Sequence, residues 1–382
     1  MKIRIVASLL AVVAASASGC RCDRDREPPP SNAPAPRPAA TVSLPASLER
    51  AKVPAIAYGI VTRDKAVAFD AAGLADGPKK IDATKDTIFE AASIGKTIIG
   101  VSVMQLVEQK KLDLDADVST YVGFAVKPPG AKVPVTLRHL LSHRGSIVDH
   151  VDQLQDARDK ATLGDFLRRY LVQEDAYAST APGAKVVYSN VGSALAAYAV
   201  EKVSGESFAD YTTAHVFTPL KMTATGWTAS KASFVVASPH RFENGAFAAL
   251  PQASHAIYPV VDLRSTVGDL GRFARAILRD GELDGARILE AKSVETMLAP
   301  ADDAKEEALG WQLRKMAGRR VVGHEGEDSG ASTGMYLDKA AGEAAIVLAN
   351  GDAFSSGDDA RTKAIQDLFA GLFDLLQSSH AN

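Results

Sequence analysis

The stretch EAASIGKT at residues 90–97 is the most informative part of the sequence. Ser93 and Lys96 are three residues apart in it, a spacing that puts both side chains on one face of a helix. The chain from Ser93 to Gln109 is apolar on nearly every side and has no proline, as expected of a buried helix. A lysine one turn into such a helix is costly to bury unless it is paired or functional. Because S-x-x-K is common by chance, other motifs in the chain are needed to show whether these two residues are functional.

Two further short motifs lie downstream of this helix. The residues YSN at 188–190 follow a Pro-Gly turn and precede an alanine-rich helical pattern over 191–203. The residues HEG at 324–326 follow a predicted strand, where a bulky side chain and a glycine can line a cleft. Taken alone, each is a weak signal, since a turn tyrosine or a histidine at a strand end usually lies at the surface.

Together and in this order, the three motifs resemble those of the penicillin-recognising serine hydrolases. The branch they resemble most is the class C β-lactamase-like one, with its esterase and D-peptidase relatives. The resemblance covers nearly all of residues 47–378. It is carried further by the stretches LRHLLSH (137–143), PG (182–183), VSG (203–205), PLKM (219–222), ST with DL (265–270), LGW (309–311) and VLAN (347–350).

The resemblance implies an α/β (α+β) fold of the β-lactamase/transpeptidase type. In that fold an antiparallel sheet, made from N- and C-terminal strands and flanked by helices, packs against a mainly helical region, and the site lies between them. The sequence pattern agrees, because it predicts a hairpin at the start of the body, three strands near the end and a final amphipathic helix. These predicted elements span 55–61 and 66–71, then 320–322, 334–337 and 343–349, and last 364–376.

The resemblance also implies a mechanism. Ser93 would be the nucleophile that forms a covalent acyl-enzyme, which water then cleaves. Lys96 and Tyr188 would share the proton transfers, and because their charges stabilise each other we do not assign the base to one of them. The start of the helix gives a field that favours negative charge at the serine. The oxyanion hole would be the backbone N–H groups of Ser93 and Glu327.

The residues expected to bind the substrate show where the chain departs from the β-lactamases. Asn190 would donate a hydrogen bond to the acyl side of the substrate, and His324 and Gly326 would line the cleft. The β-lactamases of the family usually have Lys-Thr-Gly in place of HEG, and that lysine helps to hold a substrate carboxylate. Here three acids, Glu325, Glu327 and Asp328, surround the position, so their repulsion should disfavour a carboxylate, although solvent screens exposed charges.

We therefore expect an esterase or D-amino-acid peptidase acting on neutral or cationic acyl substrates. A β-lactamase or DD-carboxypeptidase is the alternative, and a penicillin-binding receptor that is acylated without turnover is the non-enzyme alternative. The stretch VVDL at 260–263 replaces the small residues that the family commonly has there, so the resemblance does not determine the shape of that cleft wall.

Two other patterns compete for the role of the site. The residues GASTG at 330–334 match the nucleophile elbow of α/β-hydrolases, but Ser332 runs into a predicted strand where the elbow needs a helix. His139 and His143 share one helical face, near Asp149 and His150, and are an alternative metal site. The H-E-x-x-H pattern of metalloproteases is absent from the sequence at that point. We expect no metal and no cofactor.

Composition limits the partners. The chain has 382 residues, of which 46% are hydrophobic and 23% charged, enough for a large core. Its formal net charge of −3 provides no basic field, which disfavours nucleic acid as a partner. The two cysteines, Cys20 and Cys22, precede the body, so a disulfide framework, a thiolate metal cluster and a cysteine nucleophile are all excluded from it. We expect a small-molecule or peptide acyl substrate.

The N-terminal segment predicts export. Residues 1–19 combine a basic start, a short apolar run and small residues, as in a signal peptide. The junction ASGC at 17–20 resembles a bacterial lipoprotein box, which predicts lipidation at Cys20, with ordinary cleavage after a small residue as the alternative. Residues 20–45 are a proline-rich linker with seven of the 18 prolines, and 46–382 form the hydrolase domain. We expect this domain in the periplasm or cell envelope, with the lipid holding it at a membrane.

Overall fold

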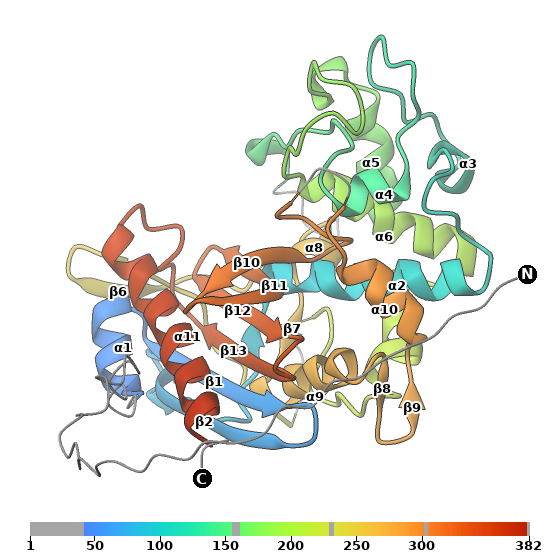
Figure 1. Cartoon of the computed structure of the whole chain (residues 1–382). Coiled ribbons are helices and arrows are strands. Elements are labelled where there is room, and N and C mark those ends of the chain that lie inside the picture. Colours follow the sequence, from blue (N-terminus) through green and yellow to red (C-terminus); the bar gives the residue numbers. More distant parts are fainter. Residues whose placement is uncertain (1–41, 155–160, 229–232, 302–304, 380–382) are drawn as a thin grey trace, which may run out of the picture. The chain divides into compact units, whose positions relative to one another are not determined.

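A seven-stranded antiparallel sheet lies at the centre of the computed structural model (Figure 1). Its strand order is β10-β11-β12-β13-β1-β2-β3, so that β1 from the N-terminal part pairs with β13 from the C-terminal part. The predicted antiparallel sheet built from both ends of the chain is thus confirmed. The strands are β1 (Ala55–Thr62), β2 (Ala66–Asp76), β3 (Ile81–Asp82), β10 (Gln312–Met316), β11 (Arg319–Asp328), β12 (Ala331–Asp338) and β13 (Glu343–Ala349).

The structure describes residues 42–154, 161–228, 233–301 and 305–379. The signal peptide at 1–19, Cys20 and the linker up to residue 41 lie outside the described residues. All described residues belong to one unit, Ala39–Asn382. Its first helix, α1 (Leu44–Ala51), includes the last two residues of the stretch that we assigned to the linker.

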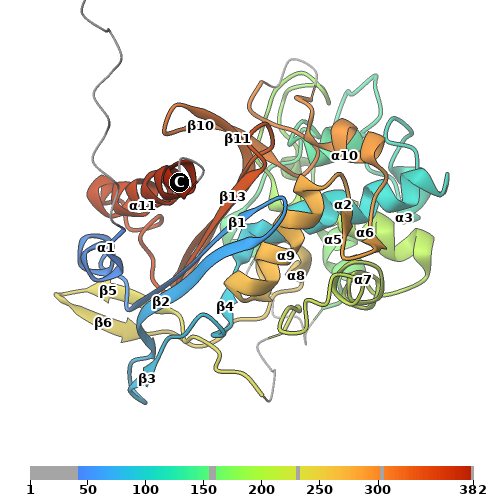
Figure 2. The ribbon, with the colours of Figure 1, turned by 60° about the horizontal axis from the view of Figure 1, so that its bottom comes forward.

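Helices cover both faces of the sheet, as Figure 2 shows. On one face α1 and the long C-terminal α11 (Asp359–Ser379) lie side by side, and on the other lies α9 (Val267–Leu278). The alternation of side chains along β13 explains this arrangement, because successive residues of a strand point to opposite faces. Val347 belongs to the core under α11, whereas Ile346 and Leu348 belong to the larger core on the other side.

A helical region packs beside the sheet, around α2 (Gly95–Glu108), in which every residue from Gly95 to Leu106 is buried. The predicted buried helix is therefore confirmed, although a 3-10 turn, η1 (Ala92–Ile94), precedes it. The helix that packs most extensively against α2 is α6 (Asn190–Ser204), the predicted alanine-rich helix. The other helices are α3 (Ser119–Val122), α4 (Leu137–Leu141), η2 (Val151–Gln153), α5 (Leu163–Leu171), η3 (Glu174–Ala176), α7 (Phe208–Thr212), a π-helix (Thr213–Phe217), α8 (Tyr258–Val261) and α10 (Ala291–Leu298).

Three small two-stranded sheets complete the fold. They pair β4 (Phe89–Glu90) with β7 (Arg264–Ser265), β5 (His240–Glu243) with β6 (Ala246–Ala249), and β8 (Glu282–Leu283) with β9 (Ala286–Arg287). The first pair fixes the chain just before Ser93, because the N–H of Ala91 also donates to the carbonyl of Leu263 at 2.7 Å.

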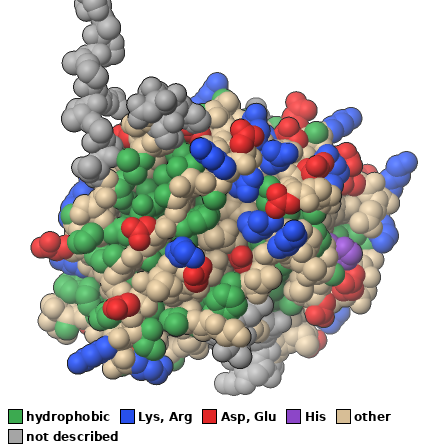
Figure 3. Space-filling model, turned by 90° about the horizontal axis from the view of Figure 1, so that it is seen from below, with side chains coloured by type: hydrophobic (Ala, Val, Ile, Leu, Met, Phe, Trp, Pro, Cys, Tyr) green, Lys and Arg blue, Asp and Glu red, His purple; other side chains and the backbone are tan. Residues whose placement is uncertain are grey.

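The surface carries mixed charges. On the face shown in Figure 3, lysines and arginines lie among aspartates and glutamates, and hydrophobic side chains gather toward one side. Within the described residues, none of the helices combines the length and the apolar character needed to span a bilayer.

Candidate active site

Ser93 stands in a tight turn at the start of the buried helix. The residue before it, Ala92, has a φ of 47°, in the left-handed region that side chains with a Cβ rarely adopt. Ala92 and Ser93 belong to η1, which leads into α2, and Ser93 lines the cavity while only 7% of its surface is exposed. Gly95 permits the close approach of α8, because a Cβ there would lie 2.8 Å from the carbonyl oxygen of Pro259.

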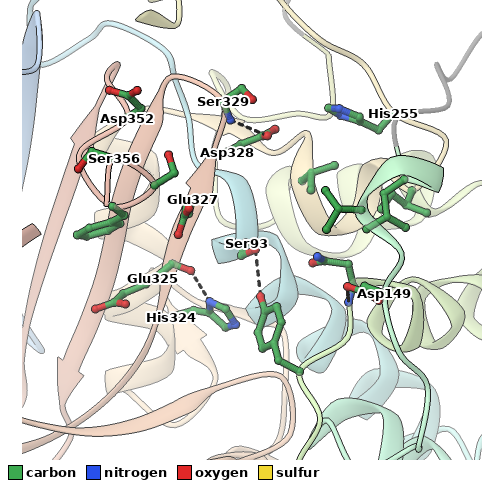
Figure 4. Close-up of a pocket in the computed structure, with 18 of the residues that line it drawn as sticks. Ser93, Asp149, His255, His324, Glu325, Glu327, Asp328, Ser329, Asp352 and Ser356 are labelled. Atoms are coloured by element: carbon green, nitrogen blue, oxygen red, sulfur yellow. Dashed lines mark hydrogen bonds between the residues drawn. The ribbon is translucent and has the colours of Figure 1, made fainter. Parts of the chain in front are cut away.

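The structure brings Ser93, which Figure 4 labels, together with Lys96, Tyr188 and Asn190, as the motifs predicted. Lys96 Nζ donates to Ser93 Oγ at 2.8 Å and to Asn190 Oδ1 at 2.8 Å. The hydroxyl of Tyr188 donates to the same Oγ at 3.2 Å, and Lys96 Nζ lies 5.1 Å from the centre of the Tyr188 ring. Lys96 is only 1% exposed, and these contacts provide the partners that a buried ammonium needs.

Asp149 holds the residues around Asn190 in place. Its carboxylate accepts hydrogen bonds from Ser189 Oγ at 2.8 Å, from the N–H of Asn190 at 2.6 Å and from the N–H of Val191 at 3.2 Å. A carboxylate here also complements the positive end of α6. Ser189 caps the same helix, because its Oγ accepts from the N–H of Gly192. From the sequence, Asp149 was predicted only as part of an alternative metal site, and its role at the start of α6 was missed.

His143 supports the other side of the tyrosine. Its ring stacks on Tyr188 with centroids 4.3 Å apart, and its Nδ1 accepts a hydrogen bond from the N–H of Ser189. Burial and the nearby charge of Lys96 lower the pKa of His143 to about 3, so the imidazole is neutral. Its Nδ1 is thus engaged by the protein backbone. Within the described residues, no group of three or more His, Cys, Asp or Glu side chains is arranged to hold a metal ion.

Gly326 brings β11 against the turn that carries Ser93. A Cβ at Gly326 would lie 2.4 Å from the carbonyl oxygen of Ala91, so only glycine allows this approach. Thr333 on β12 reinforces the contact, because its hydroxyl donates to the same carbonyl at 3.0 Å. Ser93 and Glu327, whose N–H groups we expect to form the oxyanion hole, both line the cavity.

His324 lines the cavity with a neutral ring. Its Nδ1 bonds to the backbone carbonyl of Glu325, and because a carbonyl only accepts, Nδ1 carries the proton. Burial, together with the charge of Lys96, holds the pKa of His324 well below its usual value, so the ring is neutral. Nε2 therefore keeps a free lone pair, and this buried atom has no hydrogen-bond partner among the described residues. The ring lies 6.3 Å from that of Tyr188.

The cavity has a volume of about 790 Å³, and Ser93 lies between two chemically different sides of it. One side is acidic and includes Glu325, Glu327 and Asp328, the three acids that the sequence singled out. Burial and the neighbouring acids raise the pKa of Glu327. The other side includes Asp149 and His255, and the cavity lining also contains the apolar side chains of Val151, Leu154, Ile257 and Val261.

The competing serine does not belong to this cavity. Ser332 lies fully buried in β12, and its Oγ accepts a hydrogen bond from the N–H of Phe354 at 3.0 Å. The strand that the sequence predicted around Ser332 is confirmed, and the geometry of a nucleophile elbow is not formed there.

The fold and this cluster define a serine hydrolase of the β-lactamase/transpeptidase type. The chain belongs to the beta-lactamase family, whose model matches residues 43–369. The resemblance seen in the sequence is thereby confirmed, and the members of this family are serine hydrolases.

Similar proteins include two penicillin-binding proteins. Penicillin-binding protein 4 of Amycolatopsis lactamdurans is 28% identical over 72% of this chain and 74% of its own length. Penicillin-binding protein 4* of Bacillus subtilis is 25% identical over 78% of this chain and 68% of its own length.

Solved structures share the fold. A penicillin-binding protein homologue from Pyrococcus abyssi superposes with a TM-score of 0.72 at 23% identity, over 81% of this chain and 72% of that one. The D-amino acid amidase of Ochrobactrum anthropi gives 0.70 at 22% identity, over 88% and 97% of the two chains. The hydrolase EstCE1 gives 0.67 at 19% identity, over 86% and 96%.

Proposed function

We propose that the chain is a serine acyl hydrolase of the esterase or D-amino-acid peptidase type, which works through an acyl-enzyme on Ser93. The observation that carries this proposal is the contact of Ser93 Oγ with both Lys96 Nζ and the Tyr188 hydroxyl at the base of a large cavity. A hydroxyl between two groups that can exchange protons is the arrangement that nucleophilic catalysis requires.

In the acylation step, Ser93 Oγ attacks the acyl carbonyl carbon and its proton passes to the pair formed by Lys96 and Tyr188. The backbone N–H groups of Ser93 and Glu327 stabilise the oxyanion of the tetrahedral intermediate. The bond to the leaving group then breaks, and the pair returns the proton to the alcohol or amine that departs. In the second step the same pair takes a proton from a water molecule, which attacks the carbonyl carbon of the ester on Ser93. The bond from this carbon to Ser93 Oγ then breaks, the pair returns the proton to Oγ, and the acid is released.

The substrate class follows from His324 and the acids beside it. The neutral ring of His324 carries no positive charge, so this position lacks the cation that would hold a substrate carboxylate. Glu325 and Glu327 add negative charge on this side of the cavity. We therefore propose a neutral or cationic substrate, such as an ester or a D-amino-acid amide or peptide with a free amine. The names of the amidase and of EstCE1 among the structural neighbours are compatible with this class.

The test compares three chromogenic substrates on the full chain: p-nitrophenyl butyrate, a D-alanyl anilide and a cephalosporin. We expect turnover of the ester or the anilide, its loss in Ser93→Ala, and its retention in the matched variant Ser332→Ala. Cephalosporin turnover would instead favour the β-lactamase or DD-carboxypeptidase alternative. A stoichiometric burst of acylation without turnover would favour a penicillin-binding receptor. Activity that survives Ser93→Ala would refute the nucleophile.

We further propose that the protein is exported and held at a membrane in the cell envelope through a lipid on Cys20. The lipoprotein-like junction at 17–20 and the proline-rich residues after it support this proposal. Mass spectrometry of the N-terminal peptide from the membrane fraction should find a diacylglycerol group on Cys20. The Cys20→Ala variant should move to the soluble fraction, and an unmodified wild-type peptide would contradict the proposal.

A further inference from the structure

His255 is a buried polar group of the cavity that the mechanism above does not use. It lies just before α8, is 8% exposed, and lines the same cavity as Ser93. In Figure 4 it lies on the opposite side of the cavity from Glu325 and His324. That half of the cavity also contains Asp149, which holds Asn190, the residue expected to contact the acyl side of the substrate.

Asp262 fixes the orientation of His255 through two hydrogen bonds. One carboxylate oxygen accepts from the backbone N–H of His255 at 2.8 Å, and the other lies 2.7 Å from Nδ1. Because Asp262 is a carboxylate only 2% exposed, Nδ1 carries a proton and points into the protein. The opposite edge of the ring, which carries Nε2, is left toward the cavity. This aspartate lies in the stretch VVDL, where the sequence left the shape of the cleft wall open.

The contact of Nδ1 with the buried carboxylate of Asp262 at 2.7 Å favours the protonated ring of His255, in which Nε2 is a hydrogen-bond donor. The hydrogen bond to Asp262 raises the pKa of His255, the charge of Asp328 acts in the same direction, and burial and the charge of Arg264 act against it. Protonated imidazole carries a hydrogen on both ring nitrogens. In this form the cavity has an N–H donor, and its lining also includes the apolar side chains of Ile257, Val261 and Leu154.

The ligand that matches this donor is uncharged. A carboxylate at Nε2 would approach Asp328, and a charged group would lose its hydration among the apolar side chains. An amide or ketone carbonyl needs only one donor, and it is compatible with both the nearby charge of Asp328 and the apolar side chains. Such a carbonyl would stand at the end of a short apolar arm that extends from the acyl carbon past Asn190.

We propose that His255, oriented by Asp262, determines the acyl specificity by donating a hydrogen bond to a carbonyl on the apolar arm of the acyl group. This proposal rests on the proposed function, because it names part of the substrate that Ser93 attacks. His255 is a specificity-determining residue in it and takes no part in the proton transfers.

The test uses two esters of equal chain length, p-nitrophenyl valerate and p-nitrophenyl levulinate, which differ by a ketone in the arm. The measured quantity is the ratio of their kcat/KM values, divided by the ratio of their rates with hydroxide. We expect the full chain to prefer the levulinate by about 10- to 100-fold, the worth of a hydrogen bond from a charged donor. His255→Phe should bring this ratio near one, and His255→Gln, which keeps an N–H donor, should restore part of it.

Two controls separate folding from recognition. His215→Phe changes a histidine outside the cavity and should leave the ratio as in the wild type. Asp262→Asn should lower the ratio in the same direction as His255→Phe, since the ring is then held less firmly. If the preference for the levulinate also falls as the pH rises through the pKa of His255, the donor is the imidazolium.

The outcomes distinguish the two proposals. A ratio near one in the wild type, or an equal ratio in His255→Phe, would overturn the role of His255 while ester hydrolysis by Ser93 stands. Hydrolysis of neither ester would overturn the proposed esterase activity, and the role of His255 with it.

Discussion

Replacing Asp149 by alanine should weaken both the fold and the activity. The carboxylate accepts three hydrogen bonds at the start of α6, from Ser189 Oγ and from the N–H groups of Asn190 and Val191. Loss of a helix cap costs about 1 kcal/mol, and loss of a carboxylate near a helix N-terminus costs about 0.3–1 kcal/mol. Because Asp149 lines the cavity, water replaces part of the lost bonding.

These contributions together give a loss of about 1–2 kcal/mol of unfolding free energy, or a drop in Tm of about 2–4 °C. The activity should fall more steeply, because Asn190 shares Lys96 Nζ with Ser93 and moves with the helix end. A displacement of about 1 Å in such a cluster lowers the rate by about 10²-fold.

The assay pairs thermal unfolding with kcat/KM for the hydrolysed ester. Asp149→Asn, which keeps one accepting oxygen, should lie between wild type and Asp149→Ala. The matched control is Asp152→Ala, which removes the same charge from an exposed position in η2. If Asp149→Ala stays within about twofold in kcat/KM and about 1 °C in Tm of this control, the reasoning is wrong.

Three further outcomes are expected. Tyr188→Phe removes the hydroxyl that lies 3.2 Å from Ser93 Oγ and should slow acylation by about 10²- to 10⁴-fold in single-turnover assays; a full rate would refute the proton path. Ala92→Gly should retain activity, since glycine adopts the φ of 47° without strain, whereas Ala92→Val should lose both activity and Tm, and equal behaviour of the two would contradict the strain. The pKa of His143 is about 3 in the folded chain and near 6.5 in the unfolded chain, so the neutral ring stabilises the folded state. This contribution to the unfolding free energy is fully present above pH 6.5 and is lost as the pH falls, by up to about 1.4 kcal/mol per pH unit. Denaturant titrations of wild type and His143→Asn should show the steeper acid loss in the wild type, and parallel curves would exclude this origin.

The sequence allowed the catalytic cluster to be predicted because its members lie in short motifs. Ser93 and Lys96 share a helical face, and a recognisable pattern surrounds Tyr188 and Asn190. The contacts of Asp149 with the start of α6 could not be predicted in this way, nor could the contact of Asp262 with His255. Each depends on a single aspartate in a loop, which carries no periodic signal. Their roles depend on contacts such as that of Asp149 with Ser189, 40 residues away, which only the folded chain forms.

The strands show the same limit. The hairpin and the three C-terminal strands alternate or run apolar, and β1, β2, β11, β12 and β13 were predicted from this. The edge strand β10 reads QLRKM and lacks that alternation. The strand β2 continues to Asp76, beyond the predicted end, because Gly73 adopts a φ of 90° close to the carbonyl of Pro54. A pattern of hydrophobicity does not show such an irregularity.

The pairing of β1 with β13 has a consequence for how the chain acquires its structure. The N–H of Ala55 bonds to the side chain of Asn350, a residue 295 positions later. A contact this distant closes slowly, since the loop between its ends must be ordered first. While the chain is being synthesised, β1 has β2 on one edge and an open second edge until β13 has emerged. Unfinished or truncated chains therefore expose a strand edge that chaperones and proteases recognise, and only the whole chain withdraws it.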